Sequence, residues 1–169
     1  MSDSSAWHGE NDALIRGTRM IRLANPQFPP STLSAIERVL ASGNLTQGPV
    51  VAEFETAIAR LCGARHGIAT TSATTAIELT LAALDIGPDD EVIAADFTYP
   101  ATGNAVLRRG ARLVLCDVEP DTYCLSASAL LERLTPRTTA VIAVDVFGLP
   151  ADYSALWPML QERGIKLVA

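Results

Sequence analysis

The sequence predicts an α/β fold in three layers, with helices on both faces of a mostly parallel β-sheet. The first observation is that short apolar runs alternate with helical patterns from residue 65 onward. The second is that these runs are apolar throughout, which is typical of parallel strands covered on both faces. The third is that the chain has 169 residues, 49 % of them apolar, which is enough to bury a core without disulfides or metals.

The part of the chain before this alternation predicts a tail and two helices. Residues 1–18 show no periodicity and are interpreted as a flexible tail. Residues 31–43 place apolar side chains on one face and end at Gly43, as in a capped helix. Residues 50–63 form a second amphipathic pattern, which ends at Gly63.

The alternating part predicts five strands joined by right-handed helical crossovers. The expected strands are HGIATT (66–71), EVIAA (91–95), RLVLCDV (112–118), TAVIAVDV (139–146) and IKLVA (165–169). The expected helices cover residues near 75–84, 99–109, 126–134 and 153–163. In such a sheet, ligands bind outside the carboxyl ends of the strands, so functional residues are expected at those junctions.

Charge and targeting signals exclude several functions. A net charge of −6 argues against nucleic acid as a partner, because phosphate neutralisation needs a basic face. The one basic cluster is Arg108, Arg109 and Arg112, and the first two are interpreted as cations in the last turn of a helix. No signal peptide or membrane-length apolar run is present, so we expect a cytoplasmic protein that does not bind a membrane.

The cysteines and histidines do not predict a metal site. The chain has three cysteines, Cys62, Cys116 and Cys124. An odd number without the C-x-x-C spacing suggests neither a disulfide framework nor a zinc site, so they are interpreted as buried thiols in a reducing compartment. His8 and His66 offer no cluster of metal ligands. The glycine fingerprints of dinucleotide-binding and P-loop proteins are also absent, as are the G-x-S-x-G and H-E-x-x-H motifs.

The first strand-to-helix junction is rich in hydroxyl groups. In TTSATTAIELTLAAL (70–84), Thr75 and Glu78 fit a capping box, with Thr75 as the N-cap. The remaining hydroxyls are not explained by this cap. A helix N-terminus with hydroxyl donors can bind an anion, so the turn is either a phosphate site or a cap with more hydroxyls than it needs.

Two further junctions carry single candidate residues. Tyr99 follows the second expected strand and is either a stacking platform for a flat cofactor ring or a core residue. Asp145 ends the fourth expected strand and either binds a ligand or caps the loop that Gly148 and Pro150 shape.

Several motifs together give the sequence a family resemblance. They are LTQGP, EFE, the hydroxyl-rich turn, GPDDEVI, TYPAT and RTTAVIAVDVFGLPAD, in that order. From about residue 20 onward the chain resembles the DegT/DnrJ/EryC1/StrS family, the sugar aminotransferases of the fold-type I pyridoxal-phosphate superfamily. The resemblance implies the large domain of an aspartate aminotransferase-like, PLP-dependent transferase.

The resemblance also implies roles for particular residues. Ser72, Ala73 and Thr74 match the turn that holds the phosphate of pyridoxal 5'-phosphate, and Tyr99 matches the aromatic residue that stacks on the pyridine ring. The LTQG segment, residues 45–48, would lie near the active site. Members of the family usually transfer an amino group from glutamate or glutamine to a nucleotide-linked keto-sugar, and they work as homodimers.

The sequence departs from the family pattern in several places. Ala73 replaces the usual Gly, Thr75 a usual Ala, and Asp145 a frequent His. An Ala is compatible with phosphate binding if its φ stays negative. The resemblance assigns no catalytic residue to this chain, because Lys166 is its only lysine and matches the beginning of a strand.

The family's pyridine-binding Asp and catalytic Lys would follow Ala169, and the strand there has no cap or turn after it. We therefore expect a truncated chain, inactive by itself, with a tail at 1–18 and the first part of the PLP-binding large domain at 19–169. The remainder of that domain and the small C-terminal domain would be absent. The alternatives are a non-catalytic relic or phosphate-binding module, and an α/β nucleotide-binding domain of another kind.

Overall fold

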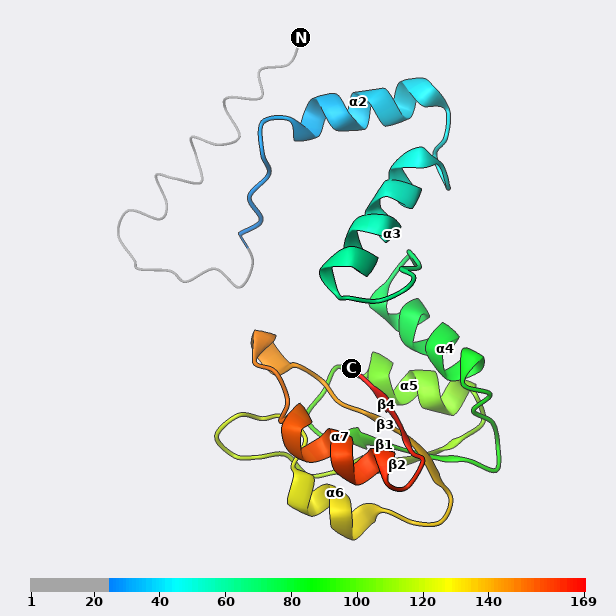
Figure 1. The fold of residues 1–169 in the computed structure, drawn as a ribbon, viewed down its shortest axis with the longest axis vertical. Helices are drawn as coiled ribbons and strands as arrows, with labels where there is room; N and C mark the ends of the chain where they lie inside the picture. The colour runs from blue at the N-terminus through cyan, green and yellow to red at the C-terminus, as the bar shows by residue number, and fades with distance from the viewer. Residues whose placement is uncertain (1–24) are drawn as a thin grey trace. The chain divides into compact units, whose positions relative to one another are not determined.

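The computed structural model describes residues 25–169 (Figure 1). The chain divides into two compact units, Met1–Gly67 and Ile68–Ala169. The predicted tail at 1–18 lies outside the described residues. None of the helices in the described part of the chain is long and apolar enough to cross a membrane.

The first unit contains the two predicted helices, α2 (Thr32–Ser42) and α3 (Pro49–Leu61). Helix α2 ends because Gly43 adopts a left-handed conformation, with φ at 73°, and donates its N–H to the carbonyl of Leu40. Helix α3 begins at a proline, whose fixed φ suits the first helical position. Both predicted helices are confirmed.

The second unit is built on four parallel strands, β1 (Glu91–Ala95), β2 (Arg112–Cys116), β3 (Thr138–Ile142) and β4 (Lys166–Val168). Their order in the sheet is β2-β1-β3-β4, so β1 is central and β4 is an edge strand. All five residues of β1 are buried, which explains why the four that follow Glu91 are apolar.

Helices cover both faces of this sheet, which confirms the three-layer α/β/α prediction. Helices α4 (Ala73–Ala83) and α5 (Ala101–Arg108) pack on one face, over Val92 and Ala94 of β1. Helices α6 (Ala127–Arg133) and α7 (Tyr153–Gln161) pack on the other, over Ile93 and Ala95. Neighbouring residues of β1 thus serve two different cores, as the period-two geometry of a strand requires. Figure 1 shows α6 and α7 together on one side of the strands.

Two predictions about this part of the chain are wrong. Residues 66–71 do not form a strand of the sheet, although their apolar pattern resembles one. A strand exists only where a neighbour hydrogen-bonds to it, and local sequence does not reveal the neighbour. Cys62 is exposed rather than buried, because it is the C-cap of α3, whereas Cys116 and Cys124 are buried as predicted.

The amino edge of the sheet is tied together by Glu91, whose side chain is 2 % exposed. Its Oε1 accepts hydrogen bonds from the hydroxyls of Thr135, at 2.8 Å, and Thr138, at 3.2 Å. Its Oε2 lies 3.6 Å from the guanidinium groups of Arg112 and Arg137. One carboxylate at the beginning of β1 therefore holds the segments that lead into β2 and β3.

Candidate functional site

The hydroxyl-rich turn is the N-terminus of α4, and its cap is Ser72. Ser72 has extended backbone angles, and its Oγ accepts the N–H of Thr75 at 3.1 Å. The prediction that Thr75 is the N-cap is therefore wrong, because the cap lies three residues earlier, at Ser72. Glu78 does not close a capping box either; its carboxylate lies 3.2 Å from the guanidinium of Arg108 in the last turn of α5.

The turn is held in shape by its own hydroxyl groups. Thr70 donates to the carbonyl of Ser72 at 3.0 Å, and the hydroxyls of Ser72 and Thr75 lie 3.0 Å apart. The hydroxyl of Thr71 lies 3.3 Å from that of Thr75. Most of the hydroxyls in this stretch thus build the turn.

Several donors of this turn remain available to a ligand. Ala73 and Thr74 are the first two helical residues, so no carbonyl within the helix can accept their N–H groups. No hydrogen bond within residues 25–169 uses the hydroxyl of Thr74. A serine hydroxyl can accept one bond and donate another, so Ser72 can cap the helix and still donate to an anion.

Ala73 is compatible with this arrangement despite replacing a glycine. It lies inside α4 and is not among the residues with positive φ. Its Cβ therefore causes no backbone strain, and its N–H keeps the orientation of a first helical residue. The donors of the turn fit a phosphate group, which carries negative charge and accepts several hydrogen bonds at once.

Tyr99 lies just before α5 and is not a core residue. Its side chain is 78 % exposed, and Pro100 follows it as the N-cap of the helix. The loop around it is fixed by a hydrogen bond of 3.0 Å between the hydroxyls of Thr98 and Thr102. Of the two interpretations of Tyr99, the exposed position favours a stacking platform.

The Ser72 turn and Tyr99 share the carboxyl edge of the sheet. Helix α4 precedes β1 and helix α5 precedes β2, so both helices run toward the amino ends of these parallel strands. Their C-terminal ends are joined by Arg109, whose Nε donates to the carbonyl of Ile86 at 3.0 Å. Both N-termini therefore face the edge where α/β proteins bind ligands. In the described part of the chain, no hydrogen bond or ring contact joins Tyr99 to the turn.

Asp145 caps the loop that follows β3. Its Oδ1 accepts the N–H of Ala151 at 3.0 Å and the hydroxyl of Tyr153 at 2.7 Å. Burial and then the neighbouring carboxylate raise the pKa of Tyr153 above its ordinary value. Between the two interpretations of Asp145, these contacts support loop capping.

A cluster of aromatic residues at the same edge was not predicted. The ring of Phe97 lies 5.2 Å from that of Tyr123 and 6.2 Å from that of Phe147, between centroids. Tyr123 and Phe147 have φ values of 59° and 55°, which bulky residues rarely adopt. Their loops are joined by a hydrogen bond from the thiol of Cys124 to the carbonyl of Leu149. The only sequence signal was an aromatic residue shortly after a strand, as at Phe97.

Comparison with known proteins gives this geometry a context. Residues 28–169 match the DegT/DnrJ/EryC1/StrS aminotransferase family. The chain belongs to this family. Its fold is also that of solved aminotransferases, because TlmJ from Streptoalloteichus hindustanus superposes with a TM-score of 0.81 at 35 % identity, over 88 % of this chain and 41 % of that one.

Two further aminotransferase structures are similar to the chain. DesV of S. venezuelae, solved in complex with a ketimine intermediate, is 36 % identical, with a TM-score of 0.79 over 81 % of this chain and 37 % of DesV. The sugar aminotransferase Spr1654 from Streptococcus pneumoniae is 29 % identical, with a TM-score of 0.80 over 88 % of this chain and 38 % of Spr1654. Spr1654 has been solved in PLP and PMP forms. The chain thus spans about two fifths of the length of these aminotransferases.

Proposed function

We propose that this chain is the part of a PLP-dependent sugar aminotransferase that holds the cofactor by its phosphate and by one face of its ring. The observation that carries the proposal is the Ser72 turn, where a capped helix N-terminus offers unused donors at the carboxyl edge of the sheet. Spr1654, which is similar to this chain, has been solved with PLP, a cofactor that carries a phosphate group. Helix N-termini at the carboxyl edge of an α/β sheet are suited to bind such a group.

The residues of the turn would bind the phosphate in separate ways. Ala73 and Thr74 would donate their N–H groups, and the hydroxyls of Ser72 and Thr74 would donate as well. The partial positive charge at the N-terminus of α4 favours the same anion. Charge-assisted hydrogen bonds of this kind contribute roughly 1.5–3 kcal/mol each.

Tyr99 would lie against the cofactor ring. Its exposed side chain can cover one face of a flat ring, and the Thr98–Thr102 hydrogen bond holds the loop that presents it. Pyridoxal phosphate, when bound, supplies the electron-accepting ring that amino transfer needs. Tyr99 would restrict the orientation of that ring and exclude water from one face.

We further propose that the 169 residues by themselves do not transfer amino groups. Lys166, the only lysine, is the first residue of β4 and so lies at the amino end of this strand. The cofactor residues lie at the opposite edge, which leaves the chain without a lysine that can bind the cofactor covalently. Residues 19–169 would form the first part of the large domain, and other parts of the enzyme would supply the lysine and the pyridine-binding carboxylate.

The whole enzyme would transfer an amino group from glutamate or glutamine to a nucleotide-linked keto-sugar, as a homodimer. The family and the likeness to Spr1654 support a sugar acceptor. The free thiols of Cys62, Cys116 and Cys124 support a reducing, cytoplasmic setting.

Two polypeptides test the proposal, the 169-residue chain and the longest reading frame that contains it. Each is incubated with pyridoxal phosphate, nitrogen-15 glutamate and a nucleotide-linked keto-hexose. We expect the longer product to place the label on the sugar, as read by mass spectrometry, and the short chain to place none. A long product that binds the cofactor but transfers nothing would indicate the binding module instead. Turnover by the short chain that is lost in Lys166→Ala would contradict the proposed division of roles.

A further inference from the structure

Three exposed aromatic residues, Phe97, Tyr123 and Phe147, form a cluster that the proposed cofactor site does not use. They come from the loops that follow β1, β2 and β3, so the cluster lies at the carboxyl edge of the sheet. Phe97 is its centre, because its ring contacts both of the others. We propose that this cluster is the subsite for the sugar ring of the acceptor, with Phe147 stacking on that ring. The proposal rests on the proposed transfer to a sugar and assigns residues to that acceptor.

Phe147 occupies a position at which an aromatic residue does not help the fold. Its side chain is 88 % exposed, so it buries little apolar surface. Its backbone has φ at 55° and ψ at 21°, in the left-handed region where a bulky residue is strained and Gly is not. Backbone strain of this kind collects at ligand-binding sites, where the surrounding structure holds it in place. An exposed ring on a strained backbone therefore points to a ligand rather than to packing.

The charges of the three loops define what the cluster can bind. Residues 96–100, 117–125 and 143–152 contain no lysine, arginine or histidine. Their charged residues are all carboxylates, namely Asp96, Asp117, Glu119, Asp121, Asp145 and Asp152. Such an edge repels phosphate groups, because like charges raise the free energy of the complex. The part of a nucleotide-linked sugar that fits the cluster is therefore the uncharged sugar ring and not the diphosphate.

A sugar ring also matches the polar group beside the cluster. One face of a pyranose carries C–H groups that pack on an aromatic ring, whereas its rim carries hydroxyls that need acceptors. Asp145, two residues before Phe147, offers such an acceptor. Its Oδ1 is held by the N–H of Ala151 and the hydroxyl of Tyr153, and its Oδ2 has no hydrogen-bond partner among residues 25–169. Aromatic side chains with a few fixed polar groups are the usual lining of a small-molecule site.

The test measures binding without turnover, in the product of the longest reading frame that contains the chain. The enzyme is loaded with pyridoxal phosphate and given no amino donor, so that no transfer occurs. The two probes are the nucleotide-linked keto-hexose of the transfer test and the same nucleoside diphosphate without its sugar. Calorimetry gives a dissociation constant for each. We expect Phe147→Gly to weaken binding of the first probe by about tenfold and to leave binding of the second unchanged.

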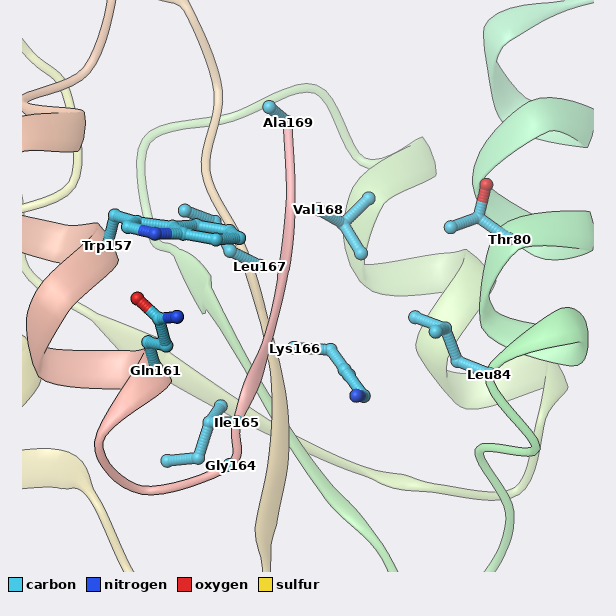
Figure 2. A pocket seen from close by; sticks show the side chains of 10 residues that line it. All are labelled: Thr80, Leu84, Trp157, Gln161, Gly164, Ile165, Lys166, Leu167, Val168 and Ala169. Atoms are coloured by element: carbon cyan, nitrogen blue, oxygen red, sulfur yellow. The ribbon is translucent and has the colours of Figure 1, made fainter. Parts of the chain in front are cut away.

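Two further variants separate the ring from the backbone, and a third is the control. Phe147→Ala lacks the ring but keeps a Cβ on the left-handed backbone, so it should bind the sugar probe as weakly as Phe147→Gly and melt at a lower temperature. Phe147→Tyr keeps a ring and should bind both probes as the wild type does. The control is Trp157→Ala, which removes an exposed aromatic side chain from helix α7. Figure 2 shows Trp157 beside β4, in a pocket that none of the three cluster residues lines, so this change should alter neither dissociation constant.

The proposal is wrong if Phe147→Gly binds the sugar probe as tightly as the wild type, or if it weakens both probes equally. It is also wrong if Phe147→Gly melts below the wild type or changes the oligomeric state in sedimentation, because the ring would then pack against another part of the enzyme or a second copy. A wild-type enzyme that binds the sugar probe but transfers no amino group would contradict the proposed function alone. One that binds neither probe would contradict both.

Discussion

The carboxylate of Glu91 accepts a hydrogen bond of 2.8 Å from the hydroxyl of Thr135, which lies 44 residues further along the chain. This contact joins the beginning of the central strand β1 to the segment that leads into β3. Because Glu91 is buried and also contacts Thr138, its loss would leave polar groups without this partner at the amino edge of the sheet.

We expect Glu91→Ala to lower the free energy of unfolding by about 2–3 kcal/mol, because buried hydrogen bonds to a charged group are lost. Glu91→Gln keeps the volume and one acceptor, so it should cost about half as much. Urea unfolding followed by circular dichroism measures both. Glu132→Gln, on the exposed surface of α6, is the control and should change stability by less than about 0.5 kcal/mol. Equal losses for Glu91→Ala and the control would contradict the assigned role.

The Ser72 turn predicts that capping and phosphate binding can be separated in the complete aminotransferase. Ser72→Ala should destabilise the cofactor-free protein by about 1 kcal/mol, because it removes the cap of α4. Thr74→Ala should leave that stability nearly unchanged and raise the dissociation constant of pyridoxal phosphate by roughly tenfold or more. Thermal unfolding and absorbance titration give the two quantities. An unchanged dissociation constant in Thr74→Ala would mean that the hydroxyls only build the turn.

The exposed position of Tyr99 predicts that its substitution lowers thermal stability only when the cofactor is bound. Tyr99→Ala should hardly change the melting temperature of the cofactor-free enzyme, because the side chain is exposed. The increase in melting temperature on adding pyridoxal phosphate should shrink, since stacking contributes roughly 0.5–1.5 kcal/mol beyond burial. Tyr99→Phe keeps the ring and should behave as the wild type. Equal melting losses with and without cofactor would instead indicate a packing residue.

The contact between Tyr153 and Asp145 predicts that the stability of the fold depends on pH in the alkaline range. The pKa of Tyr153 is raised in the folded chain, chiefly by burial and then by Asp145. Above pH 10, its ordinary pKa, the unfolded state loses the phenol proton while the folded state retains it, so stability falls as pH rises. Tyr153→Phe cannot titrate, and its stability should fall less between pH 9 and 11. Parallel slopes from urea unfolding at several pH values in this range would refute the prediction.

The sequence predicts a helix or strand well where neighbouring residues determine it, and poorly where contacts with distant residues determine it. The strand at 91–95 was predicted with its observed bounds, because an apolar run between polar turns suffices when both faces are buried. The N-cap was misplaced because Ser72, Thr74 and Thr75 are all good caps, and the path of the chain into α4 decides among them. The strand expected at 66–71 failed for a non-local reason, since pairing depends on a distant partner.

In the candidate site, too, only local features could be predicted from the sequence. Adjacency in the sequence was enough to group Ser72, Ala73 and Thr74. The position of Tyr99 directly after a strand was enough to make it a candidate. The left-handed backbone of Tyr123 and Phe147 could not be predicted, since no local preference puts an aromatic residue there. The Cys124–Leu149 hydrogen bond joins the two loops that carry these residues and is a tertiary contact, which local sequence does not reveal.

The position of Glu91 at the amino edge has a consequence for how this scaffold can be diversified. The anchor lies at one end of the strands and the loops that carry Ser72, Tyr99 and Phe147 lie at the other, so a mutagenesis library confined to the loops leaves the anchor intact. Selection for a new ligand can therefore sample loop sequences without first restoring the scaffold. In a library that included Glu91, members such as Glu91→Ala would start with about 2–3 kcal/mol less stability before any activity was screened.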